Sequence, residues 1–396
     1  MSVRLKEAAD LVTRCVEAES RPFVALEHIE SGSGRLVPQV ELPEREAPDT
    51  GAAAVQAGDV LFGKLRPYLA KTWLADRPVF ASTELLCLRP RPGVDGRWLA
   101  YLVATRRLVE WAVASSDGTK MPRTSWEKLA EYRIDIPSIA TQRAIADYLD
   151  RETARIDALI EKKQRMIELA EMRFWTALVD AVLQCDAPLT PIRRVLTFLT
   201  DGPFGSAFTS QDYSGDGAAV VRLGNIGFAE YRPAEQAFIP LRMYRSFLRH
   251  QVMPGDLLIA GLGDPSNHPG RACVAPDLGP AMVKGKCFCA RVDARRASSE
   301  YLALLLSSPY GAQLLGVSGH GSTRTMINLE IIKETPLPLP GASDQERIVQ
   351  TANRHRRHTR SLVVALTEQI SRLGEHRQAL ITAAITGELD VPGVAA

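Results

Sequence analysis

The 396-residue sequence lacks the motifs that most enzymes of this size carry. It has no G-x-x-x-x-G-K-[ST] phosphate loop, no G-x-S-x-G nucleophile elbow and no H-E-x-x-H metal motif. Its nearest approach to a phosphate loop, GPAMVKGKC, has the wrong spacing and the wrong final residue. An amino-methyltransferase would need an Asn-Pro-Pro-aromatic segment to hold the target amine, and none occurs. We therefore expect a chain that is not itself an enzyme.

Long apolar runs and paired cysteines are also missing. No apolar run reaches the length of a membrane span, and the charged N-terminal segment lacks the apolar core of a signal peptide. Of six scattered cysteines, only Cys287 and Cys289 lie close together, and they lack the second pair that a Cys₄ zinc site needs. His355 and His358 are interpreted as solvated basic surface. These absences predict buried thiols, no bound metal and a reducing cytoplasm.

A basic excess of the kind that is typical of nucleic-acid-binding domains is absent too. The formal net charge is only +2, so an anionic partner would have to be held by local clusters of cations. At 396 residues the chain exceeds one ordinary hydrophobic core, which predicts at least two domains.

What the sequence does contain is a pair of long helical segments. Residues 142–171 have no Gly and no Pro, and apolar residues from Ile145 through Leu149, Ile156, Leu159 and Met166 form one stripe at helical spacing. Residues 344–391 show a similar stripe. A helix this long needs a partner for its apolar stripe, and each segment offers one to the other.

The two segments belong to an internal repeat. Gln142 aligns with Gln345 and Ile145 with Ile348, both at an offset of 203 residues. The offset also aligns WLAYLV (98–103) with YLALLL (301–306), whereas GDVLF at Gly58 matches GDLLI at Gly255 at an offset of 197. We predict an α/β or α+β globular domain duplicated in tandem, with each copy followed by a long helix. The helices should form an antiparallel coiled coil with an overall pseudo-two-fold axis. The predicted boundaries are 1–138, 139–185, 186–340 and 341–396.

These features together resemble the specificity subunit of a Type I restriction-modification system. Each motif alone is modest, but their order and the duplication are specific to that family. The motifs that carry the resemblance are ALEHIESGSGRL (25–36), FGKLRPYLAK (62–71), STELLCLRP (82–90), GTKMPR (118–123), QRAIADYLDRETARIDALIEK (142–162), DGPFGS (201–206), VRLGNI (221–226), GDLLIA (255–260) and HRQALITAAITGELDV.

The resemblance implies a function without chemistry. Each globular domain would be a target recognition domain that reads one half of a bipartite double-stranded DNA sequence, and the coiled coil would set the gap. The chain would recruit two methyltransferase subunits, which bind S-adenosylmethionine and methylate adenine N6. It could also recruit motor-nuclease restriction subunits, which use ATP and Mg²⁺. The chain itself would bind no cofactor.

One departure from an even repeat concerns charge. Residues 142–183 carry 7 basic and 8 acidic residues, whereas 343–386 carry 7 and 4, with three histidines. The two helices therefore need not bind partners alike. The alternative function is a coiled-coil scaffold that docks two protein partners without reading DNA, and the near-neutral charge of residues 1–138 favours it.

Candidate contact residues lie in loops, where a rigid scaffold often presents binding groups. Lysine and arginine suit phosphates, arginine suits guanine and asparagine suits adenine; ordinary surface charge, packing or turn formation is the competing interpretation. The DNA-binding candidates are Lys64, Arg66, Tyr68, Lys71, Lys120, Arg123, Arg222, Asn225, Arg271, Arg324 and Asn328. Phe174 and Trp175 on the first long helix are candidates for partner docking, with coiled-coil packing as the alternative.

Overall fold

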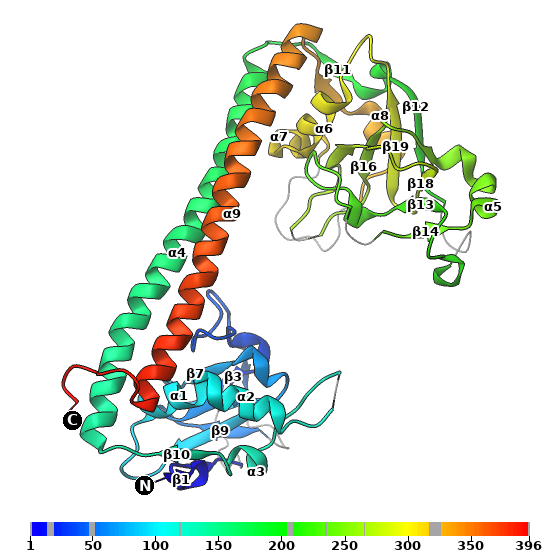
Figure 1. Ribbon diagram of the computed structural model, residues 1–396. Helices are drawn as coiled ribbons and strands as arrows, with labels where there is room; N and C mark the ends of the chain where they lie inside the picture. Colours follow the sequence, from blue (N-terminus) through cyan, green and yellow to red (C-terminus); the bar gives the residue numbers. More distant parts are fainter. Residues whose placement is uncertain are drawn as a thin grey trace. The chain divides into compact units, whose positions relative to one another are not determined.

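The computed structural model places the chain in two compact units (Figure 1). It describes residues 2–13, 20–46, 52–118, 120–203, 209–233, 236–264, 266–316 and 326–394. Unit 1 comprises Met1–Gln164 together with Leu366–Ala396, and unit 2 comprises Arg165–Ala365. The two 45-residue helices, α4 (Ile139–Leu183) and α9 (Ala342–Thr386), each contribute one part to each unit. The long helices predicted from the sequence are thereby confirmed.

The globular part of unit 1 contains small sheets and three short helices. Its strands are β1 (Ser2–Arg4), β2 (Ala9–Leu11), β3 (Arg21–Val24), β4 (Glu44–Arg45), β5 (Ala53–Val55), β6 (Val60–Gly63), β7 (Thr72–Leu74), β8 (Val79–Ala81), β9 (Leu85–Pro90) and β10 (Arg133–Asp135). Its helices are α1 (Gly96–Ala104), α2 (Arg106–Ala114) and α3 (Trp126–Leu129). The strands form sheets in the orders β2-β9-β6-β7, β4-β3-β8-β5 and β1-β10.

The globular part of unit 2 repeats this strand order. Its strands are β11 (Leu189–Pro191), β12 (Leu196–Asp201), β13 (Ala218–Val221), β14 (Phe238–Ile239), β15 (Gln251–Val252), β16 (Leu257–Ala260), β17 (Ala272–Val274), β18 (Ala281–Val283), β19 (Cys287–Val292) and β20 (Pro336–Pro338). Its helices are α5 (Leu241–Tyr244), α6 (Ser299–Ser307), α7 (Pro309–Leu314) and α8 (Leu329–Glu334). The sheet orders are β12-β19-β16-β17, β14-β13-β18-β15 and β11-β20. The pairs β3–β8 and β13–β18 are parallel, and the other pairs are antiparallel.

A buried aspartate stabilises the central sheet of each unit in the same way. Asp59, before β6, accepts a bidentate pair of hydrogen bonds from Arg89 at 2.9 and 2.7 Å. Asp256, before β16, accepts the equivalent pair from Arg291, both at 2.9 Å. A buried carboxylate is tolerated only when its charge and lone pairs are satisfied. The Asp that follows Gly in GDVLF and GDLLI is thus part of the framework of the fold.

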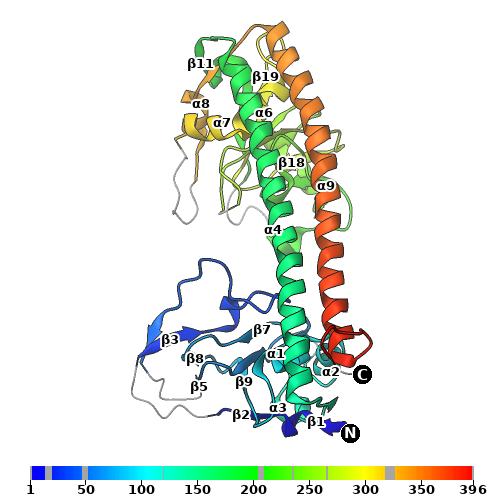
Figure 2. The ribbon, with the colours of Figure 1, turned by 90° about the vertical axis from the view of Figure 1, so that its left-hand side faces the viewer.

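The long helices pack against each other in antiparallel directions within each unit (Figure 2). In unit 1, Asp157 of α4 pairs with Arg377 of α9 at 3.0 Å, and Lys163 donates to Gln369 at 2.6 Å. In unit 2, the Arg356 guanidinium lies 5.6 Å from the centre of the Phe174 ring. In each case a later residue of α4 meets an earlier residue of α9.

The predicted apolar stripe of the first helix is only partly correct. Ile145, Leu149 and Ile156 are buried, whereas Leu159 and Met166 are 47% and 49% exposed. An α-helix drifts by about 20° per heptad relative to a 3.5-residue repeat, so a stripe that begins against a neighbour turns away from it. Phe174, Leu178 and Val182 restore burial in unit 2.

A buried glutamine fastens the first turn of each long helix to its globular domain. The Gln142 side chain accepts from the Asp95 N–H at 2.8 Å and donates to the carbonyls of Gly93 and Pro137 at 3.0 and 2.8 Å. Gln345 repeats this pattern, accepting from the N–H of Ser298 and donating to the carbonyls of Arg296 and Pro340. Both glutamines are at most 2% exposed, so these bonds replace the water that the amide would otherwise require.

Candidate nucleic-acid interface

In unit 1, two loops that the sequence separates by about fifty residues join into one surface. The loop after β6 pairs with the segment before α3 through a β-bridge between Leu65 and Arg123. The Arg66 N–H donates to the Pro122 carbonyl at 2.8 Å, and the Thr124 N–H donates to the Lys64 carbonyl at 3.0 Å. These backbone bonds fix the relative positions of FGKLRPYLAK and GTKMPR.

Four of the predicted cations and one tyrosine lie on this surface. Arg66, Lys120 and Arg123 are exposed, Lys64 is half-buried, and the Tyr68 side chain is 53% exposed. Arg123 pairs with Glu84 at 2.8 Å. Cations suit phosphate oxygens, and an exposed aromatic ring offers a face for stacking or groove contact. We name Lys64, Arg66, Tyr68, Lys120 and Arg123 the basic loop cluster.

The backbone of this cluster is unusual at two positions. Arg66 and Ala70 flank the short turn Pro67–Leu69 and have left-handed φ values of 50° and 46°. Left-handed backbone is unfavourable for residues with a Cβ and is often found at functional sites.

Two further residues of these loops differ from expectation. The Lys71 ammonium donates to the Leu26 carbonyl at 2.9 Å, which gives this side chain a role within the fold and places it outside the exposed cluster. Met121 is 53% exposed beside Lys120, which does not fit packing into the core, the competing interpretation of this loop.

Unit 2 builds the equivalent surface with other side chains. Leu262, after β16, pairs with Met326 before α8, and the Ile327 N–H donates to the Gly261 carbonyl at 2.9 Å. Asn328 is exposed and its side chain accepts from the Ile331 N–H at 2.9 Å, which caps α8. Arg324 lies outside the described residues.

The cations of this second surface lie on the connection between β18 and β19. The Lys64 N–H of unit 1 donates to the Glu84 carbonyl, and in unit 2 the Gly261 N–H donates to the Lys286 carbonyl. Lys286 therefore occupies the place of Glu84. Its neighbour Lys284 donates to the Tyr213 hydroxyl at 2.9 Å. The two surfaces thus share a framework and differ in the placement of charge.

Two of the predicted base contacts in unit 2 need correction. Arg271 is 4% exposed, and its guanidinium donates to four backbone carbonyls, those of Ile226, Leu262, His268 and Leu223. Burial lowers the pKa of this arginine. Asn225 is 2% exposed, and its amide accepts from the Arg222 N–H and donates to the Arg232 carbonyl. Both side chains hold loops together and are not accessible to a base edge. Arg222 itself is half-buried at the start of this turn.

The two aromatic candidates on α4 have different positions. Phe174 is 8% exposed and belongs to the hydrophobic core of unit 2, so the prediction that it docks a partner is not supported by its burial. Trp175 is half-buried and lines a cavity of about 780 Å³ together with Met172, Val179 and Tyr310.

Cys87, Cys273, Cys287 and Cys289 are buried, as predicted, whereas Cys185 is half-buried and Cys15 lies outside the described residues. Burial raises the pKa of Cys273 and of Cys287 to about 12, and it also raises the pKa of Cys87 and Cys289. A thiol with so high a pKa is neither a nucleophile nor a ready metal ligand. Within the described ranges, no group of three His, Cys, Asp or Glu side chains is arranged to hold a metal ion.

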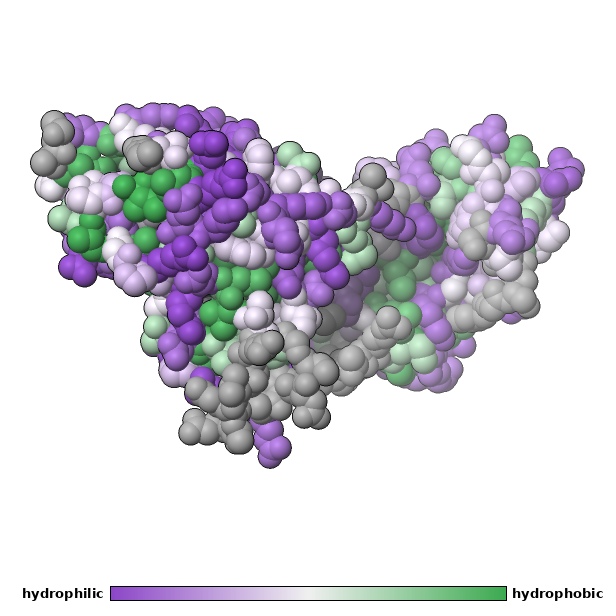
Figure 3. Space-filling model, turned by 90° about the horizontal axis from the view of Figure 1, so that it is seen from below, coloured by the Kyte–Doolittle hydropathy of each residue, from purple (hydrophilic) through white to green (hydrophobic). Residues whose placement is uncertain are grey.

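On the face shown in Figure 3, hydrophobic residues occur as separate patches among hydrophilic ones. Within the part of the chain that the structure describes, no helix combines the length and apolarity that crossing a bilayer requires.

Comparisons with known proteins define the class. The family model described as the Type I restriction modification DNA specificity domain matches residues 39–169, which include the basic loop cluster. A chain from the structural study of complex assembly and conformational transition of the type I R-M system has the same fold, with a TM-score of 0.72 at 20% identity, over 98% of both chains. The matched segment is therefore similar to a DNA specificity domain.

Curated relatives name the family. The sequence is 23% identical over 164 residues to the specificity subunit of the Type I restriction enzyme EcoDI from Escherichia coli. It is 21% identical over 164 residues to that of HindI from Haemophilus influenzae. These matches cover 41% and 40% of this chain and 36% and 34% of the relatives, so about a third of each relative is aligned. Residues 39–169 are thus similar to the DNA specificity domain of Type I restriction-modification systems, and both of these curated relatives are specificity subunits.

Proposed function

We propose that this chain is the DNA-reading subunit of a Type I restriction-modification complex, in which each globular domain contacts one half of a bipartite sequence. The observation that carries the proposal is the repeated surface. Each unit joins the loop after its central strand to the segment before α3 or α8 by an equivalent β-bridge and one equivalent backbone hydrogen bond. The side chains on that shared framework differ, as expected for two readers of different half-sites.

The proposed organisation is a tandem duplication with α4 and α9 as an antiparallel coiled coil. It would comprise recognition domains at 1–138 and 186–340 and spacer helices at 139–185 and 341–396. A rigid spacer would convert helix length into a fixed gap between half-sites. Buried glutamines at the same point of both helices and the common strand order support this organisation.

The proposed partners supply the chemistry. Two methyltransferase subunits would bring S-adenosylmethionine, and restriction subunits would bring ATP and Mg²⁺. The cavity beside Trp175 supports docking of a protein on α4, because Met172 on its wall is 56% exposed. An exposed apolar side chain beside an aromatic ring is typical of a surface that another protein covers.

Removing cations of the basic loop cluster should weaken DNA binding. Arg66→Ala and Lys120→Ala in the assembled complex should each lower affinity and reduce the dependence of log Kd on log salt by about one, because one phosphate contact disappears. The measurement is equilibrium binding to duplex DNA at several salt concentrations. Arg77→Ala is the matched control, since Arg77 is also an exposed arginine of unit 1 and lies outside the cluster. Equal effects of all three changes on affinity and salt dependence would contradict the placement of the basic loop cluster at the DNA interface.

Mapping of adenine methylation in the host genome tests the function as a whole. A split motif should be present with the intact gene, vanish when the gene is deleted, and return when the gene is restored. The restored strain is the control for effects on neighbouring genes. If every split motif persisted in the deletion strain, the chain would not be the reader, and the scaffold alternative would take its place.

A further inference from the structure

A short hairpin in each unit has the same construction. In unit 1 a β-bridge joins Ile29 to Leu36, and the Glu30 N–H donates to the Arg35 carbonyl at 2.9 Å. In unit 2 a β-bridge joins Ile226 to Tyr231, and the Gly227 N–H donates to the Glu230 carbonyl at 3.0 Å. Arg35 and Glu230 thus hold equivalent places, each immediately before the residue that closes its hairpin. We name residues 29–36 the first hairpin and residues 226–231 the second hairpin.

Each hairpin forms an ion pair with a long helix at an equivalent position. Arg35 pairs with Asp157 of α4 at 2.7 Å and approaches Glu161 at 3.5 Å. Glu230 pairs with Arg360 of α9 at 2.9 Å. The offset of 203 residues that aligns Gln142 with Gln345 also aligns Asp157 with Arg360. In unit 1 the hairpin residue is basic and the helix residue is acidic, whereas in unit 2 the hairpin residue is acidic and the helix residue is basic.

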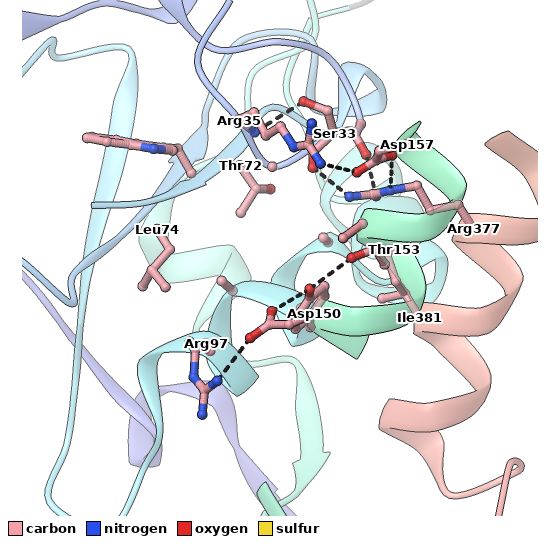
Figure 4. Close-up of a pocket in the computed structure, with 17 residues that line it drawn as sticks. Ser33, Arg35, Thr72, Leu74, Arg97, Asp150, Thr153, Asp157, Arg377 and Ile381 are labelled. Atoms are coloured by element: carbon pink, nitrogen blue, oxygen red, sulfur yellow. Dashed lines mark hydrogen bonds and ion pairs between the residues drawn. The ribbon is translucent and has the colours of Figure 1, made fainter. Parts of the chain in front are cut away.

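Arginines of α9 add a second attachment to each hairpin. In unit 1, Arg377 donates to the carbonyls of Gly32 and Ser33 at 3.0 and 2.6 Å while its Nε donates to Asp157 at 3.0 Å (Figure 4). The Arg377 and Asp157 side chains are 10% and 12% exposed, so this attachment is largely shielded from water.

In unit 2 the second attachment of the hairpin comes from Arg356 of α9. Arg356 donates to the Ala229 carbonyl at 2.8 Å and lies over the Phe174 ring. Its aligned partner in α4 is Thr153, which bonds to the Leu149 carbonyl of its own helix at 2.7 Å. Besides Arg377 of α9, the first hairpin therefore faces Asp157 and Glu161 of α4, whereas the second hairpin faces Arg356 and Arg360 of α9.

We propose that the ion pairs Arg35–Asp157 and Glu230–Arg360, whose charges are reversed between the units, make each globular domain pack on its own long helix. We call these two ion pairs the charge-reversed key. A first hairpin that carried an acidic residue at position 35 would face Asp157 and Glu161. A second hairpin that carried a basic residue at position 230 would face Arg356 and Arg360. Like charges at these distances repel, so exchange of the two domains between positions is opposed. The inference concerns assembly of the chain and does not depend on DNA reading.

Charge reversal in the full-length chain tests the key. In Glu230→Arg and in Arg360→Glu, exchange of the Gly227 amide proton should be faster by roughly three- to tenfold, because the hairpin opens more often when its pair is replaced by like charges. In the double variant E230R/R360E the pair is restored in reverse order, and the exchange rate should return to within about twofold of the native rate. Hydrogen–deuterium exchange read at the hairpin amides measures this.

Two controls distinguish loss of the Glu230–Arg360 ion pair from the effect of changing any surface charge. Arg357→Glu makes the same charge change on an exposed neighbour in α9 and should leave the Gly227 rate unchanged. In unit 1, Arg35→Glu should accelerate exchange of the Glu30 amide, whereas Arg35→Lys should largely preserve protection. The key is overturned if E230R/R360E is no better protected than the single variants, or if R357E matches R360E. An unchanged thermal midpoint in all the variants shows that the chains are folded.

Discussion

Exchanging residues 1–138 for the corresponding domain of a Type I specificity subunit is expected to change one half of the methylated DNA sequence and to leave the other half unaltered. All residues of the basic loop cluster lie within 1–138, and the equivalent framework of unit 2 lies beyond residue 186. Base contacts specify sequence, and each mismatched base pair costs about 1–3 kcal/mol, so a half-site of several base pairs should switch completely. Sequencing of methylated adenines in the host genome reads both halves at once.

The donor domain should come from the first position of its own subunit and carry a basic residue where Arg35 stands. A donor with an acidic residue there should assemble poorly against Asp157 and give weaker methylation of an otherwise correct hybrid motif. The control is the native domain rejoined across the same junction at residue 138, which should retain the native motif. A change in both half-sites would contradict the assignment of one half to each domain.

Lengthening both long helices by one turn should widen the unread gap without changing either half-site. Four residues inserted after Gln164 in α4 and four after Ala365 in α9 add about 6 Å to each helix, which corresponds to about one or two base pairs of DNA. The half-sites stay the same because the loops that would contact bases are untouched. Methylation mapping of the variant strain measures the gap directly.

Insertion after Gln164 in α4 alone provides the contrast. With α9 unchanged, the helices can keep either the contacts of unit 1, such as Asp157 with Arg377, or those of unit 2, such as Phe174 with Arg356, but not both sets. Loss of methylation is expected, because the antiparallel contacts of both helices cannot be satisfied together. If the paired insertion left the gap unaltered, the helices would not set the spacing.

Much of the fold could be predicted because it depends on local patterns. The absence of Gly and Pro and the apolar spacing predicted α4, and the matching offsets predicted the equivalent positions of Gln142 and Gln345. The burial of Leu159 and Met166 was predicted wrongly. Periodicity identifies a face of the helix, whereas the neighbour that covers each turn of that face is set by tertiary packing.

The candidate site was predicted less completely. The sequence did not show that the loops of Lys64 and Lys120 would be joined by backbone hydrogen bonds. The residue types in these loops did indicate an anionic partner. Arg271 and Asn225 have suitable chemistry for bases, but their hydrogen-bonding groups are satisfied inside the fold. Residue type shows what a side chain is able to bind, and only the tertiary structure shows whether that capacity is already used.

The glutamine bonds at the start of each long helix restrict torsion as well as position. Gln345 is bonded to backbone on the segments before α6 and before α9, so the first turn of α9 and the domain that precedes it rotate as one body. A single residue added just after Gln345 would turn that body by about 100° about the axis of α9. Lengths of these helices are therefore expected to vary among relatives in steps close to whole turns, because an intermediate length would rotate the proposed DNA-contacting loops away from the duplex.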